Sequence, residues 1–139
     1  MKIILQEHEK YVLRFDKDEE VFAGLTEFAT ANNIGAATFT GLGTCSMVEM
    51  AYFNPFLKEY RKKPYRENYE IVSLIGNIAK LDGKPAIHAH GSFGATDFTL
   101  LGGHIFQIVV LATCEILLTK LEGNMERKNN PDFNLNLLV

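Results

Sequence analysis

Apolar and polar residues alternate over most of the chain, which is the pattern of β-strands with one buried face. Two short runs near the N-terminus, residues 2–8 and 10–15, predict a pair of strands. The alternation returns after residue 35, so we expect most of the chain to be sheet. The further expected strands are residues 36–40, 46–53, 69–74, 76–80, 86–90, 104–112, 115–121 and 133–139.

One segment has the helical period instead. Val21, Leu25 and Phe28 recur at spacings that place them on one face of a helix. We expect this helix to end near Asn32. The acidic residues before it suit its beginning: Asp16 or Asp18 as the N-cap, and Glu19 and Glu20 in the first turn.

Glycine-containing steps separate the expected strands. Gly41-Leu42-Gly43 divides two of them, residues 82–85 suit a hairpin turn, and Gly102-Gly103 precedes His104. Many strands joined by short links, with one convincing helix, predict the α+β class with a mostly antiparallel β-sheet. A length of 139 residues predicts a single domain, 1–139.

Composition excludes several classes of protein. Apolar residues make up 47% and charged residues 22%, as in folded globular domains. The longest apolar stretch, residues 105–112, is too short for a membrane-spanning helix, so no membrane association is expected. The N-terminal apolar run is too short for a signal peptide, so we expect a cytoplasmic location. Cys45 and Cys114 follow no disulfide or metal-site pattern, and we interpret them as buried free thiols.

Three of the four histidines are candidates for a metal site. His88 and His90 form a His-x-His step, which places both rings on one face of a strand. His104 opens the next strand, within reach of the same centre. Three neutral imidazoles with an open fourth position are typical of a catalytic or exchangeable zinc site. The alternative is a set of histidines that lines a subunit interface or a polar groove, whereas His8 is expected to be an isolated surface residue.

Three carboxylates could accompany these histidines. Glu70 interrupts an apolar run, and we name it as the candidate catalytic residue, as a base or as a partner of an imidazole. Its alternative is a place on the solvent face of its strand. Asp97 suits a turn and Glu115 an exposed strand position.

The charge distribution is uneven. Residues 58–66 contain five basic residues and one acid, a local charge of +4, so the remaining residues total −7 against the net charge of −3. This segment is the candidate nucleic-acid-binding surface, and a solvated loop is the alternative. Its basic residues are Lys58, Arg61, Lys62, Lys63 and Arg66.

Several short motifs, spread over nearly the whole chain, resemble one known family. They include Thr40-Gly41-Leu42-Gly43, residues 69–78, His88-Ala89-His90-Gly91, Gly102-Gly103-His104, Thr113-Cys114-Glu115-Ile116, Arg127 and residues 133–135. Together they resemble the plants-and-prokaryotes conserved (PPC) domain. The resemblance implies a fold similar to that of alpha-acetolactate decarboxylase, a homotrimer, and a metal centre at His88, His90 and His104. The chain has no AT-hook, the DNA-binding motif that accompanies this domain in plants.

Three functions follow as hypotheses. The first is a trimeric regulatory protein that carries zinc or another divalent transition metal and has DNA or a transcription factor as its partner. The second is a metal-dependent lyase or hydrolase that binds a small carbonyl, carboxylate or ester molecule at the metal. The third is an assembly module, in which the apolar chain end 135–139 forms a strand between subunits.

Overall fold

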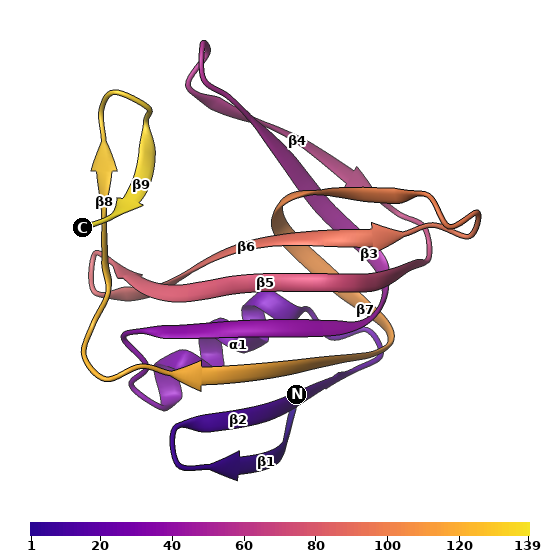
Figure 1. Ribbon diagram of the computed structural model, residues 1–139, viewed down its shortest axis with the longest axis horizontal. Helices are drawn as coiled ribbons and strands as arrows, with labels where there is room; N and C mark the ends of the chain where they lie inside the picture. Colours follow the sequence, from indigo (N-terminus) through magenta and orange to yellow (C-terminus); the bar gives the residue numbers. More distant parts are fainter.

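The computed structural model describes residues 1–139 as nine strands and one helix (Figure 1). All nine strands join one sheet, which confirms the predicted α+β class. The bounds are β1 Lys2–Glu7, β2 Lys10–Asp16, α1 Val21–Ala31, β3 Ala37–Asn54, β4 Glu59–Tyr65, β5 Tyr69–Leu81, β6 Lys84–Gly94, β7 Leu100–Lys120, β8 Glu126–Asn130 and β9 Leu135–Leu138.

The sheet is antiparallel except where β8 joins it. The main path runs β1-β2-β7-β3-β5-β8-β9, and β5 pairs with β8 in parallel. β6 pairs with both β5 and β7, and β7 also pairs with β3, so four strands form a closed hydrogen-bonded ring. This closure sets the end of β6 beside the beginning of β7, and so decides where the histidines lie.

Three long strands, β3, β5 and β7, each replace a pair of predicted short ones. β3 runs through Gly41-Leu42-Gly43, and β7 runs through Gly102-Gly103 and through the expected gap after residue 112, so the predicted breaks are wrong. The glycines mark irregular pairing, because register shifts occur between Gly41 and Gly43 and again after Gly43. Gly43 has φ +147, and a Cβ there would lie 2.2 Å from the Thr113 carbonyl oxygen. β5 likewise continues through Gly76.

The helix begins differently from the prediction. Glu20 is the N-cap, and its carboxylate accepts hydrogen bonds from the backbone N–H groups of Phe22 and Ala23. It also accepts from the backbone N–H of Ile108, which fastens α1 to β7. Asp18 cannot take this role because it turns the chain with a left-handed φ of 67. The predicted end near Asn32 is confirmed, since that residue is the C-cap.

The core lies between α1 and one face of the sheet. Leu25 and Phe28 of the helix are buried against the strands, together with Phe15, Phe39 and the other members of one apolar cluster. The opposite face of β3, β5 and β7 remains open and exposes Leu42, Val72, Ile75 and Leu117. No helix in the structure is long and apolar enough to span a membrane.

The C-terminal residues form a hairpin of their own. β8 and β9 pair antiparallel, so the expected strand at residues 135–139 is present as β9 and forms one edge of the sheet. Figure 1 shows this hairpin standing across the end of β5 and β6. Two residue pairs, Lys80 with Glu126 and Leu81 with Arg127, connect it to the sheet. Arg127 is the one charged residue that the fold buries, with 9% of its surface exposed.

Candidate metal centre

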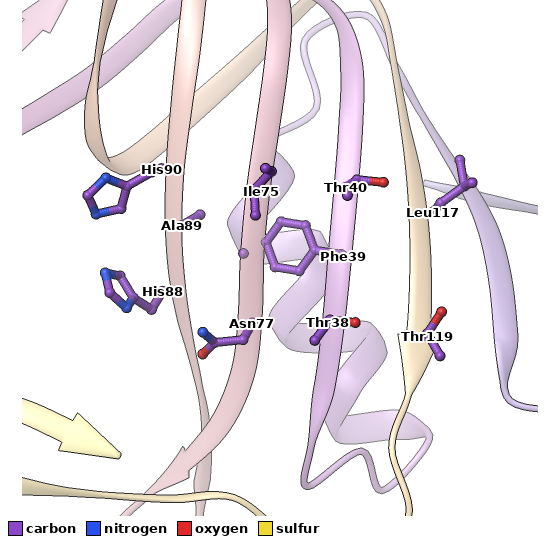
Figure 2. Close-up of a pocket in the computed structure, with 11 residues that line it drawn as sticks. Thr38, Phe39, Thr40, Ile75, Asn77, His88, Ala89, His90, Leu117 and Thr119 are labelled. Atoms are coloured by element: carbon purple, nitrogen blue, oxygen red, sulfur yellow. The ribbon is translucent and has the colours of Figure 1, made fainter.

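Three histidines from neighbouring strands lie together at the junction of β6 and β7. His88 and His90 project from one face of β6, whereas Ala89 between them is buried in the core (Figure 2). His104 lies directly opposite His90 in the antiparallel pairing. One nitrogen of each ring lies within 4.8 Å of the others, so small side-chain rotations bring all three to one ion. The predicted convergence of these histidines is confirmed.

The environment favours neutral imidazoles, the form that binds a metal ion. Burial lowers the pKa of His88, and the charges of Arg127 and His90 lower it further. Burial also lowers the pKa of His104 to about 4, with contributions from His88 and His90. The Nδ1 atom of His104 is buried and has no hydrogen-bond partner in the protein. The lowered pKa values of His88 and His104 and the unpaired Nδ1 of His104 therefore fit a divalent transition metal.

Aromatic side chains enclose His104. Tyr60 of β4 and Phe106 of β7 each place a ring centroid 4.7 Å from that of the imidazole. The ammonium of Lys62 lies 3.6 Å from the centroid of Phe106, on the same face of β4 as Tyr60. Phe106 could have been found from the sequence, because it follows His104 by two residues on one strand face.

Arg127 also lies beside the histidines, although the sequence alone assigned it no role at the site. Its Nη1 donates to the Asn136 carbonyl oxygen and its Nη2 to the Asn77 side-chain oxygen, each at 2.8 Å. Nη2 also lies 3.4 Å from Nδ1 of His88. The Nε atom is buried without a partner. None of the five ion pairs in the structure includes Arg127.

Two hollows meet at His88. A groove of about 610 Å³ crosses the open face of the sheet and contains Ile75, Leu117 and His90 (Figure 2). A second hollow, of about 500 Å³, lies between the histidines and the C-terminal hairpin. Its polar lining includes His88, His104 and Arg127. Such a volume is enough for a small molecule beside the metal position.

The candidate carboxylates lie elsewhere. Glu70 is exposed and pairs with Gly94 on β6, four residues beyond His90, so the structure does not bring it to the histidines. The sequence suggested a role there because Glu70 lies in an apolar run, yet its side chain is on the exposed face of β5. Asp97 accepts two hydrogen bonds from Thr99 in a turn, and Glu115 is exposed on β7, as expected. His8 lies in the turn between β1 and β2.

The basic residues occupy a projecting strand rather than a loop. β4 pairs with the outer half of β3, and the two strands form an arm beyond the body of the sheet (Figure 1). Arg61 and Lys63 lie on the opposite face of β4 from Lys62, because successive residues of a strand point to opposite faces. They line a separate hollow beside Tyr52 and Met50. Lys58 lies in the turn before the strand and Arg66 directly after it, and all five basic residues are exposed.

Comparison with known proteins gives one consistent family. Residues 5–122 match the description "Plants and Prokaryotes Conserved (PCC) domain". A plant- and prokaryote-conserved (PPC) protein of Pyrococcus horikoshii is 34% identical, with a TM-score of 0.89 over 94% of this chain and 90% of that one. A metal-containing protein of Archaeoglobus fulgidus is 31% identical, with a TM-score of 0.89 over 100% and 99% of the two chains.

A further relative carries a DNA-related name. A "putative DNA binding protein" of Bacteroides thetaiotaomicron is 27% identical and has a TM-score of 0.93 over 97% of this chain and 94% of that one. Alpha-acetolactate decarboxylase of Bacillus subtilis, 16% identical, shares the fold with a TM-score of 0.58. The chain covers 57% of that enzyme, so this likeness concerns the fold alone. No curated protein matches the sequence.

Proposed function

Because the chain belongs to the Plants and Prokaryotes Conserved (PCC, also written PPC) domain family, we propose that it is a metal-binding regulatory protein that associates with DNA. His88, His90 and His104 hold one zinc ion and leave a coordination position open to water or a small ligand. The observation that carries this proposal is the approach of three imidazole nitrogens to within 4.8 Å. A relative from Archaeoglobus fulgidus that is named as metal-containing supports it.

Metal analysis of the untagged protein tests the centre. We expect one zinc per chain in the wild type and loss of the ion in His90→Ala. His8→Ala is the matched control, because this substitution also removes one imidazole, but from the turn between β1 and β2. Stoichiometric zinc in His90→Ala, or none in the wild type, contradicts the proposal. An anomalous signal at the zinc edge identifies the element.

The protein assembles as a homotrimer in this proposal, as the family resemblance implies. The open face of the sheet supports the assembly, because Leu42, Val72, Ile75 and Leu117 expose more than half of their surfaces on neighbouring strands. An apolar sheet face of this kind is stable in water when another surface covers it. A second copy of the chain is the proposed cover. The two buried free thiols agree with a cytoplasmic location.

DNA association rests on the basic arm. Arg61 and Lys63 present two cations on one face of β4, and a trimer would present this face three times. Relatives from Bacteroides thetaiotaomicron and Ralstonia eutropha bear names that refer to DNA binding. Phosphate contacts of this type position a protein on DNA without reading its sequence, so we propose binding of low sequence specificity.

A second candidate function is a metal-dependent lyase or hydrolase. The hollow of about 500 Å³ beside His88 and His104 favours it, since a small carbonyl, carboxylate or ester molecule could reach the metal there. Glu70 has no part in this alternative, because it is exposed at the other end of β5. Turnover that requires zinc and is lost in His104→Ala would support the enzyme over the regulatory protein.

A further inference from the structure

A buried cation without a counter-charge lies beside the histidines. Arg127 exposes 9% of its surface, and no carboxylate forms an ion pair with it. The hollow next to it contains no aspartate or glutamate. Burial without a compensating charge is costly for a guanidinium. An anion that entered this hollow would supply the missing charge.

The rest of the hollow is apolar. Seven of its twelve lining residues are hydrophobic, among them Ile87, Phe106, Leu135 and Leu137. An inorganic ion would leave these side chains without contacts, whereas a carboxylate on a short hydrocarbon chain would satisfy both parts of the lining. Guanidinium groups bind carboxylates particularly well because their N–H donors form a planar fork.

Two N–H groups of Arg127 have no partner in the protein, the buried Nε–H and one N–H of Nη1. The guanidinium has five N–H groups, and three are directed to Asn136, Asn77 and His88. The contact with Nδ1 of His88 requires an unprotonated nitrogen there, since arginine only donates. A metal-bound neutral His88 has no such nitrogen: either Nδ1 binds the ion, or Nε2 does and Nδ1 carries the proton. Metal loading therefore releases a third donor and adds positive charge.

We propose that the hollow between the histidines and the β8–β9 hairpin binds a small carboxylate with a short apolar chain, that Arg127 pairs with the carboxylate, and that zinc loading strengthens this binding. The inference rests on the proposed metal centre and names the ligand class of its open side. Arg127, Leu135 and Leu137 all come from the β8–β9 hairpin, so we expect this hairpin to determine the ligand specificity of the hollow.

Calorimetric titration tests the proposal with isobutyrate as the probe. Isobutyramide is its uncharged analogue, and inorganic phosphate is a competing anion. Zinc-loaded wild type should bind isobutyrate at least tenfold more tightly than either. Arg127→Gln should lose at least tenfold in isobutyrate affinity and retain its zinc. Lys128→Gln is the matched control, because it removes an exposed charge from the next position of β8 and should change neither value.

A second variant covers the case in which Arg127→Gln does not fold. Leu137→Trp fills the hollow from an exposed position of β9 and should abolish isobutyrate binding with zinc retained. Circular dichroism verifies the fold of both variants. In the wild type, isobutyrate should raise the affinity for zinc by the same factor by which zinc raises the affinity for isobutyrate.

The outcomes separate this inference from the metal centre. Full zinc content with no isobutyrate binding, or with equal binding in Arg127→Gln, overturns the carboxylate site and leaves the metal centre intact. Tighter binding of phosphate overturns the assignment to a carboxylate. No zinc in the wild type overturns the proposed metal centre and the zinc dependence. Isobutyrate binding by that metal-free protein, if lost in Arg127→Gln, would still support the anion pocket.

Discussion

His90 and His104 lie directly opposite each other on β6 and β7, with ring centroids 5.4 Å apart. Gly103 pairs with Gly91 and Gly102 with Ser92 in the same strand pair. The strands approach closely at these glycines, because a Cβ on Gly102 would lie 2.9 Å from the Gly91 carbonyl oxygen. The separation of the two imidazoles therefore depends on residues that do not bind the metal.

The first prediction follows from this close approach. Gly102→Ala should force β6 and β7 apart and lower the affinity for zinc roughly tenfold, although all three histidines are present. Competition with a chromogenic chelator measures the affinity. Gly94→Ala is the control, since it lies in the same strand pair, has no left-handed φ, and a Cβ there meets no atom closer than 3.4 Å. Equal zinc affinities in the two variants would contradict the prediction.

The sequence predicted the histidine group because its signals are local. A His-x-His step has the period of a strand, and the next expected strand begins with His104, so adjacency of the two strands was enough. The turn at Asp82-Gly83 was equally readable, because both residues take a left-handed φ in a two-residue hairpin turn. The antiparallel sheet and its single helix followed from the periodicity alone.

The sequence could not reveal features that depend on distant contacts. Gly41-Leu42-Gly43 suggested a turn, yet β3 continues because Gly43 packs against the backbone of Thr113, seventy residues away. β4 carries charged residues on both faces, so it lacks the apolar–polar alternation by which a strand is predicted from sequence. Arg127 reaches His88 because β8 pairs with β5 in parallel through two residue pairs. No local sequence pattern predicts this pairing. The apolar residues around Glu70 in the sequence suggest a buried catalytic carboxylate, but they do not show which face of β5 its side chain lies on.

The second prediction concerns DNA. A gel-shift titration with duplex DNA should show affinity that falls steeply with salt, with a log–log slope near −0.9 for each phosphate contacted. Reversal of two charges in Arg61→Glu/Lys63→Glu should abolish the shift, because these side chains share one face of β4. Lys10→Glu/Lys17→Glu makes the same change in charge at exposed positions near the N-terminus and should leave binding intact. Binding that the β4 variant retains would exclude the basic arm.

The third prediction concerns the two cysteines. Burial raises the pKa of both the Cys45 and Cys114 thiols to about 12, so neither forms the reactive thiolate at pH 8. Iodoacetamide should leave the native protein unlabelled and modify two sites after unfolding in guanidinium, as counted by mass spectrometry. Because the thiol pKa values are higher in the folded than in the unfolded state, their contribution to the free energy of unfolding is complete below pH 9. The free energy of unfolding should therefore fall as the pH rises from about 9 towards 12. Rapid labelling of the native protein at pH 8 would disprove the burial.

The fourth prediction concerns assembly. Ile75 and Leu117 expose 60% and 59% of their surfaces in the groove over the open sheet face. Ile75→Lys/Leu117→Lys should place two charges in the proposed contact between copies and convert the trimer to a monomer, as measured by sedimentation velocity. Both side chains already point away from the core, so the isolated chain should keep its fold and its circular dichroism spectrum.

Leu5→Lys is the matched control for this variant, because Leu5 is 57% exposed on β1, away from the groove. A trimer that survives the double substitution would show that another surface joins the copies. His90 lies in the same groove as Ile75 and Leu117, so a trimer formed through this groove would also limit the access of solvent to the proposed metal centre. We therefore expect the monomeric variant to bind zinc and to exchange it faster than the trimer, and an unchanged exchange rate would separate the metal centre from the subunit contact.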